Sequence, residues 1–163
     1  MVHLENKLLW CLKKGKDEGR KHRGLREIKP NMEEAMRHMA KSRHNLNATS
    51  YLIKGNYSDW AVSTSFYAMY HCLLAILAKY GYESRNQECT IAAVQMLINK
   101  KKINLDATWL KKIGTFNDNE EDMIALREEF QYGTNMVVDK ERLNEIVQDT
   151  KEFVEAVKEI IEQ

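Results

Sequence analysis

The sequence has few of the residues that interrupt helices. Pro30 is the single proline among 163 residues, and there are only seven glycines. A proline inside a helix removes a backbone donor and clashes with the preceding turn, so long stretches of this chain are free to be helical. Alternation of apolar and polar residues, the pattern of half-buried strands, is also scarce, and we expect no strand. These absences favour an all-α protein.

Cysteine is scarce as well. The three cysteines, Cys11, Cys72 and Cys89, are an odd number at wide spacing and form no C-x-x-C motif. The N-terminus lacks the basic-then-apolar pattern of a secretion signal. We interpret the chain as a cytoplasmic protein in which all three cysteines are buried free thiols rather than nucleophiles.

Motifs for metal-dependent or phosphate-transfer chemistry are missing. No two histidines occur at the spacing of three or four residues that would place two metal ligands on one helix face; the five are His3, His22, His38, His44 and His71. A glycine-rich phosphate loop, a G-x-S-x-G elbow and an H-E-x-x-H pattern are also absent. We therefore expect no metal and no cofactor, and the familiar hydrolase and kinase classes have no support.

The longest stretch without charge runs from Trp60 to Ala78. Its length reaches the roughly 18 residues at which a membrane-spanning helix is considered. Its serine, threonine, tyrosine and histidine side chains would all need partners in lipid, and no second hydrophobic span exists. We interpret the run as the central helix of a bundle and expect no membrane association.

Amphipathic stretches lie on both sides of this run. The pattern predicts further helices over residues 2–14, 31–55, 88–99, 105–113, 120–132 and 139–161. The expected fold is all-α, an antiparallel up-and-down four-helix bundle with additional short helices. Residues 1–29 are the expected N-terminal short helix and basic connector, and residues 30–163 the expected bundle.

The net charge of +1 conceals an uneven distribution. Between residues 13 and 29 eight lysines and arginines accompany three acids, whereas residues 139–163 carry eight acids and four bases. The basic stretch also contains Gly15, Gly19 and Gly24, so we expect it to be mobile. It is either a solvated helix end with its connector or an arm that contacts phosphate.

Two polar clusters interrupt apolar surfaces. Tyr67 and His71 lie one turn apart on the central helix, where they are either core aromatics with hydrogen-bond partners or the wall of a pocket. The second cluster is formed by Arg127, which lies in an apolar stretch, with Tyr132 and the turn that follows it. The Arg127 guanidinium either snorkels to solvent, pairs with one of the acids at residues 120–121 or with a C-terminal glutamate, or points into a cleft.

A series of short motifs occurs in the order and spacing of a known family. The motifs are Ala40–Arg43, Leu52–Tyr57, Ser65–His71, Tyr80–Tyr82 and, before the final amphipathic helix, Leu126–Gly133. With the final helix and the residues that flank the motifs, the matching region covers about residues 32 to 161. They resemble the HEPN domain, in particular its small stand-alone prokaryotic branch.

The resemblance implies a four-helix bundle that forms a two-fold homodimer. Many HEPN proteins are metal-independent RNases in which an arginine and a histidine cleave RNA through the ribose 2′-hydroxyl, and others pair with a small nucleotidyltransferase in toxin-antitoxin modules. The resemblance assigns Arg127 to the motif arginine and Tyr132 to the position of the motif histidine. A tyrosine, with a pKa near 10, is a poor base at neutral pH, whereas a histidine titrates near 6.5.

The first functional hypothesis is a homodimer that binds a nucleotide or RNA at Arg127 and Tyr132, with Tyr67, His71 and Asn135 as further ligand-binding residues. It includes a toxin-antitoxin role beside a nucleotidyltransferase partner. One alternative is a non-catalytic interaction module in which Arg127 is structural. The other is a weak metal-independent endoribonuclease that uses Arg127 for phosphate and Tyr132 for proton transfer.

Overall fold

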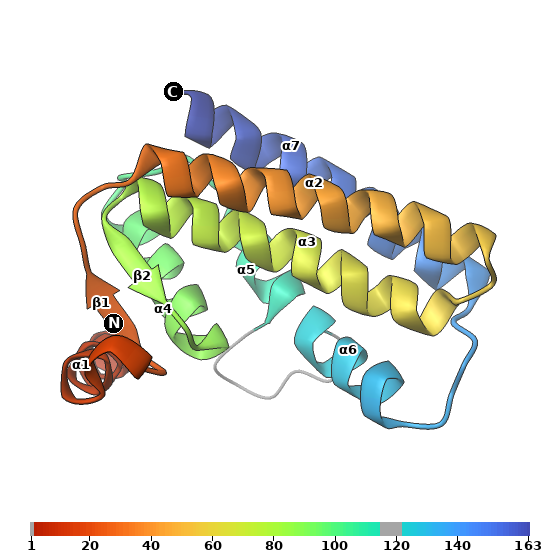
Figure 1. Cartoon of the computed structure of the whole chain (residues 1–163), viewed down its shortest axis with the longest axis horizontal. Helices are drawn as coiled ribbons and strands as arrows, with labels where there is room; N and C mark the ends of the chain where they lie inside the picture. Colours follow the sequence, from red (N-terminus) through yellow and green to blue (C-terminus); the bar gives the residue numbers. More distant parts are fainter. Residues whose placement is uncertain (1, 115–121) are drawn as a thin grey trace.

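Two long antiparallel helices form the centre of the molecule. The computed structural model describes residues 2–114 and 122–163. Within them α2 (Met32–Lys54) and α3 (Ser58–Lys79) lie side by side, joined by the short turn at residues 55–57 (Figure 1). The C-terminal helix α7 (Lys140–Glu162) packs on the same pair. With α6 (Met123–Tyr132) beneath α3, these helices make the predicted up-and-down bundle.

α3 is the core helix of this bundle. It contacts α2, α4, α6 and α7, and most of its side chains are buried. It is also the one described helix long and apolar enough to cross a membrane, but 72% of its apolar window is buried inside the protein. A helix surrounded by other helices is apolar on all faces, which explains the uncharged run. The predicted core helix is confirmed.

Side-chain caps determine where the two long outer helices begin. The Asn31 Oδ1 atom accepts a hydrogen bond from the Glu34 backbone nitrogen at 2.9 Å. The Asp139 carboxylate accepts from the backbone nitrogens of Glu141 and Arg142 at 3.0 and 3.1 Å. Each contact satisfies donors that the first turn of a helix leaves open. Both starts agree with the sequence analysis.

The shorter helices are α4 (Gln87–Asn99), α5 (Thr108–Ile113) and α6, of which α5 is the shortest. α4 begins one residue earlier than predicted, whereas α5 and α6 each begin three residues later. Asn86 and Asp122 cap α4 and α6. Asp106, which lies inside the predicted range of α5, accepts a hydrogen bond from the Thr108 nitrogen at 2.9 Å and forms a turn just before the helix. Residues 120 and 121, where we expected α6 to start, lie outside the described residues.

The N-terminal segment is more regular than the sequence suggested. α1 (Val2–Asp17) is followed by a 3₁₀ turn, η1 (Gly19–Lys21), and by β1 (Leu25–Glu27), which pairs antiparallel with β2 (Tyr82–Ser84). The expectation of no strand was therefore wrong, because three-residue strands are too short to show a periodic pattern. A Cβ atom on Gly24 would collide with the Cys11 carbonyl, so glycine permits this close packing.

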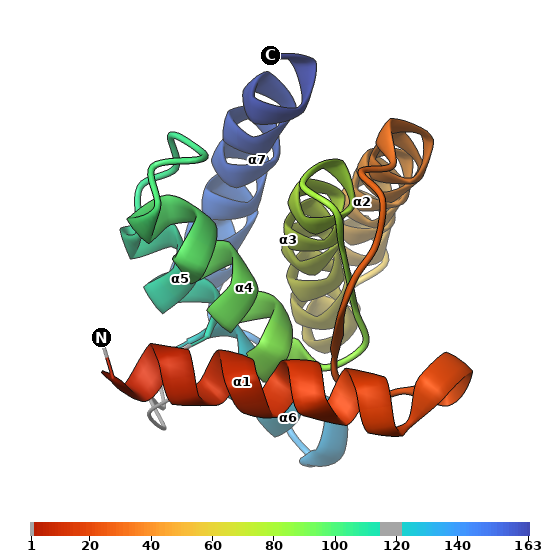
Figure 2. The ribbon, with the colours of Figure 1, turned by 90° about the vertical axis from the view of Figure 1, so that its left-hand side faces the viewer.

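The cysteines correct a second expectation. Cys11 of α1 and Cys89 of α4 form a disulfide, with their Cα atoms 5.7 Å apart. Figure 2 shows α1 lying across the end of α4. The expectation of three free thiols was wrong for this pair, because only tertiary packing brings together residues that are 78 positions apart. Cys72 is free and buried as expected, and burial raises the pKa of its thiol to about 12.

Candidate functional site

Arg127 lies at the interface between α6 and α3, where the residue is 6% exposed. Its Nη1 donates to the Tyr67 hydroxyl at 3.3 Å, and its Nη2 donates to Glu128 Oε1 at 3.2 Å. The guanidinium carbon lies 4.9 Å from the centre of the Phe66 ring, within the range of a cation–π contact. The arginine is therefore held by two aromatic rings and by a single carboxylate.

Three buried polar atoms at this interface have no hydrogen-bond partner among the described residues. They are Nε of Arg127, Oε1 of Gln131 and Oγ of Ser63. Arg127 and Gln131 lie one turn apart on α6, as Ser63 and Tyr67 do on α3. Buried polar groups are nearly always paired, so an incomplete set marks a place where water, a ligand or a partner supplies the missing bonds.

Tyr132 and Asn135 lie outside this interface. Tyr132 is the last residue of α6 and is 75% exposed, and Asn135 is exposed in the segment that follows. Within the described part of the chain, no hydrogen bond or ring contact joins Tyr132 to Arg127. The structure therefore brings Tyr67 to Arg127 but leaves Tyr132 facing solvent.

His71 faces α2 instead of α6. Its Nδ1 lies 2.9 Å from the Nδ1 of His38. Burial, with repulsion from His38 and Lys41, lowers the pKa of His71 to about 4. Burial also lowers the pKa of His38, against the attraction of Glu34. At neutral pH both rings are uncharged, and the Nδ1–H of one ring donates a hydrogen bond to the Nδ1 of the other.

Sequence reasoning missed Phe66 and His38 as neighbours of the candidate residues. Phe66 is fully buried, packs edge-on against Tyr67 and supports the guanidinium of Arg127. Its position next to Tyr67 in the Ser65–His71 motif was the available signal. His38 lies 33 residues before His71, so no local pattern links the two.

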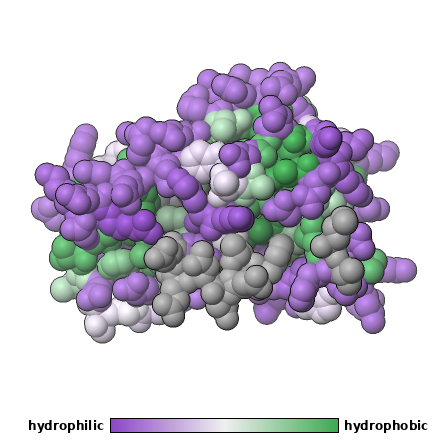
Figure 3. Space-filling view, turned by 180° about the vertical axis from the view of Figure 1, so that it is seen from behind, coloured by the Kyte–Doolittle hydropathy of each residue, from purple (hydrophilic) through white to green (hydrophobic). Residues whose placement is uncertain are grey.

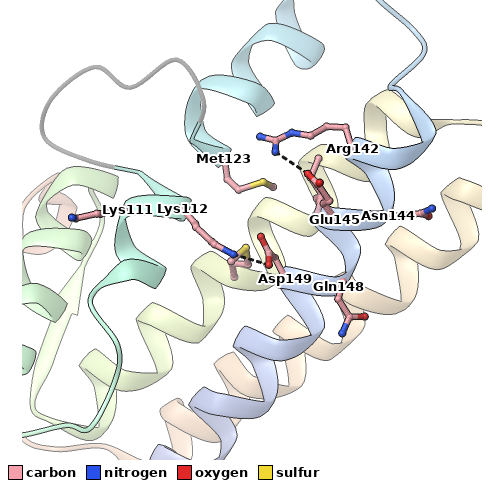
Figure 4. Close-up of a pocket in the computed structure, with 10 residues that line it drawn as sticks. Lys111, Lys112, Met123, Arg142, Asn144, Glu145, Gln148 and Asp149 are labelled. Carbon is pink, nitrogen blue, oxygen red and sulfur yellow. Dashed lines mark hydrogen bonds and ion pairs between the residues drawn. The ribbon is translucent and has the colours of Figure 1, made fainter.

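A cleft with a volume of about 740 Å³ lies between α5 and α7; Met69 and Met123 also line it, whereas Arg127 does not. Figure 4 shows Lys112 pointing towards Asp149 and Arg142 towards Glu145. The Lys112–Asp149 pair joins α5 to α7 at 2.8 Å, and the Arg142–Glu145 pair lies within α7 at 3.3 Å, so charges of both signs line the cleft. It lacks the excess of one charge that would indicate a ligand class.

A smaller cleft of about 440 Å³ lies beside the histidine pair and is lined by residues that include Glu34, His38 and Arg85. Within residues 2–114 and 122–163 there is no group of three histidine, cysteine, aspartate or glutamate side chains arranged to hold a metal ion.

Comparison with known protein families gives a match that covers most of the chain. The model of the HEPN domain family matches residues 35–160. The chain belongs to the HEPN domain family. The match covers the HEPN bundle almost from the start of α2 to the end of α7, whereas α1, η1 and β1 precede it. No curated protein matches the chain.

Proposed function

We propose that this HEPN protein binds RNA or a nucleotide as a cytoplasmic homodimer, with Arg127 holding a phosphate. The observation that carries the proposal is the environment of the guanidinium. Tyr67 and Phe66 orient it, and it forms an ion pair with Glu128, whose side chain is 56% exposed. Arginine binds phosphate through charge-assisted hydrogen bonds. A phosphate that displaces the Glu128 carboxylate would take over its bond to Nη2.

The geometry favours binding over cleavage. Cleavage through the 2′-hydroxyl needs a group that exchanges protons near pH 7 beside the phosphate-binding residue. Tyr132 stands where the family motif has histidine, and it is 75% exposed without contact to Arg127. We therefore keep the weak endoribonuclease, with Arg127 and Tyr132 as its catalytic residues, as an alternative. It requires a partner copy or a rearrangement of α6 to bring the two together.

Arg127→Met tests the proposal, because methionine fills the same volume without the charge. Binding of single-stranded RNA and of AMP should be measured at low salt, with Arg37→Ala as the control. Arg37 is an exposed arginine of α2 that pairs with Glu33 and Glu34. We expect Arg127→Met to weaken binding about tenfold or more and Arg37→Ala to leave it unchanged. Circular dichroism checks that both variants fold.

Two results would contradict the proposal. One is that the wild-type protein binds neither probe at low salt, where electrostatic binding is strongest. The other is that Arg127→Met binds both probes like the wild type. Cleavage of RNA in EDTA by the wild type, lost in Tyr132→Phe, would favour the endoribonuclease.

A second candidate function is a non-catalytic interaction module. Exposed aromatic and apolar side chains gather at the end of the bundle formed by the α2–α3 turn and the segment after α6; they are Tyr51, Tyr57, Trp60, Tyr132, Met136 and Val137. The view from behind also shows hydrophobic residues at the surface of this end (Figure 3). We call this set the apolar end. Surfaces of this kind mark protein contacts, either with a second copy or with a nucleotidyltransferase of a toxin-antitoxin pair.

A further inference from the structure

The outer face of α1 is apolar and basic at once. Its inner face carries Leu8, Cys11 and Leu12, which pack against the core. On the outer face Leu9 is 65% and Trp10 47% exposed. The ammonium groups of Lys7 and Lys14 lie 4.9 and 4.8 Å from the centre of the Trp10 ring. An exposed tryptophan among lysines is an arrangement suited to anionic ligands that contain rings.

The positive charge continues beyond the helix. Five exposed basic residues of α1, η1 and the following turn make no ion pair with any other described residue; they are Lys13, Lys16, Arg20, Lys21 and Arg23. Together with Leu9 and Trp10 we call them the α1 basic face. Its charge is therefore available to a ligand.

The nearby acids do not neutralise this face. Glu18 binds the Arg23 backbone nitrogen and lies 4.0 Å from Lys14. Glu83 pairs with Arg85 at 2.8 Å, and Glu88 pairs with Lys7. Asp17 and Glu27 are the remaining acids between residues 13 and 29, against eight bases. A net positive field remains.

The α1 basic face is held in one position on the bundle. The Cys11–Cys89 disulfide joins α1 to α4, and β1 pairs with β2. Arg85 donates through Nη1 to the Arg20 carbonyl at 2.8 Å. A preformed surface loses less conformational entropy when it binds a ligand.

We propose that the α1 basic face binds single-stranded RNA as a second contact site, outside the HEPN-matched region. The inference rests partly on the proposed function, because it extends the RNA path from Arg127. Figures 1 and 2 both show α1 and α6 below α3, so the two elements lie on the same side of this helix. The phosphates pair with the lysines and arginines of this face, and a nucleobase stacks on Trp10.

A membrane surface is the weaker candidate ligand for this face. Helices that lie in a membrane interface present a broad apolar face to the lipid. Here the apolar face of α1 packs inward, and the outer face offers only Leu9 and Trp10. The chemistry fits a flexible polyanion with exposed bases better than it fits lipid chains.

The test uses the triple variant Lys13→Gln/Lys16→Gln/Lys21→Gln and a matched control, Lys100→Gln/Lys102→Gln/Lys151→Gln, which removes three exposed lysines elsewhere. Affinity for a poly(U) strand of about 20 nucleotides is measured over a range of salt concentrations. Loss of three phosphate contacts should weaken binding at least tenfold at low salt. It should also reduce the salt slope by about 2. The control should change neither quantity.

Trp10→Ala tests stacking separately from charge. We expect it to weaken binding roughly tenfold with an unchanged salt slope, since stacking releases no counterions. The second probe is AMP, which is too small to reach from one site to the other. Its affinity should fall in Arg127→Met and stay unchanged in the triple variant.

The outcomes separate this inference from the proposed function. If the triple variant and Trp10→Ala bind poly(U) like the wild type while Arg127→Met does not, the α1 basic face is not an RNA site and the proposed function stands. If only the α1 variants weaken binding, the inference holds and the role of Arg127 is wrong. Absence of RNA binding by the wild type, or loss in the triple variant of binding to anionic vesicles alone, overturns the inference.

Discussion

His38 and His71 form a partly buried contact between α2 and α3 that needs at least one neutral ring as the hydrogen-bond acceptor. Their Nδ1 atoms are 2.9 Å apart, which allows one N–H···N hydrogen bond when neither ring carries a charge. Protonation of both would place two positive charges in contact. Glu34 lies 3.7 Å from His38 Nε2 and would stabilise a positive charge there, whereas Lys41 is a positive charge near His71. The neighbouring charges therefore do not fully offset the repulsion between two protonated rings.

This pair predicts a loss of stability in mild acid. The unfolded histidines titrate near 6.5, whereas the pKa of His71 in the folded protein is lowered to about 4. Between these values the unfolded state binds more protons than the folded state, so stability rises with pH in this window. The contribution is complete above about pH 6.5 and is lost as the pH falls towards 4. Urea midpoints measured across this range test it.

The matched variant is His38→Gln/His71→Gln, which keeps polar side chains but removes both titrating rings. We expect its urea midpoint to depend less steeply on pH between 4 and 6.5 than that of the wild type. His44, an exposed histidine of α2, supplies the control variant His44→Gln. An equal slope in the wild type and the double variant would show that other groups dominate acid unfolding.

At the scale of elements, the N-terminal unit of α1, η1 and β1 is attached to the HEPN bundle by a few defined contacts. α1 packs on α4 and β1, and the disulfide joins it covalently to α4. The unit precedes the family match, so its attachment is a feature of this chain beyond the HEPN bundle. Disulfides are rare in a reducing cytoplasm, so the state of this one bears directly on the proposed location.

Thiol counting gives the corresponding prediction. Unfolded without reductant, the protein should accept one alkyl group, on Cys72, and after reduction it should accept three. Mass spectrometry distinguishes the protein that carries one alkyl group from the protein that carries three. Reduction should also lower the free energy of unfolding by roughly 2–4 kcal/mol, because the disulfide restricts the unfolded chain.

The double variant Cys11→Ser/Cys89→Ser is the matched control. Its urea midpoint should lie near that of the reduced wild type and should not respond to reductant. Three alkyl groups on unreduced protein purified under oxidising conditions would contradict the pairing. A midpoint of the wild type that is the same with and without reductant would contradict its stabilising role.

At the scale of the whole molecule, two unlike surfaces lie at opposite ends of the bundle. The apolar end surrounds the α2–α3 turn, and the α1 basic face lies beside the other end of α3 (Figure 1). The Ser58 hydroxyl accepts from the Val138 nitrogen at 2.9 Å, which fixes the segment after α6 against the start of α3. The proposed dimer would use the apolar end, leaving the α1 basic face open for RNA.

Light scattering tests this arrangement. A dimer has twice the 19.1 kDa mass of the chain. Trp60→Ser/Val137→Ser removes two exposed side chains of the apolar end, which are 52% and 80% exposed. Burial of such side chains contributes about 1.5–3 kcal/mol each, so we expect the dissociation constant to rise roughly 100-fold or more. Leu9→Ser, at the other end, should leave the dimer intact. A wild type that remains monomeric at all concentrations would contradict the dimer.

Much of the fold was predictable because its signals are local. Asn31 and Asp139 cap their helices with side chains that are neighbours in sequence. The uncharged run from Trp60 to Ala78 indicated a helix surrounded by others, and α3 is that helix. The series of short motifs from residue 40 to residue 133 likewise indicated the HEPN family, whose model matches residues 35–160. Each cap, uncharged run or motif consists of residues that are close together in the sequence.

The sequence by itself determined the helices, their order and the family. Only the tertiary structure decided the partners: Cys11 with Cys89, His38 with His71, and Arg127 with Tyr67. It also decided that Arg127 is buried while Tyr132, five positions on, faces solvent. Helical periodicity depends on neighbours along the chain, whereas pairing, burial and shifted pKa values depend on residues that packing brings together from distant positions.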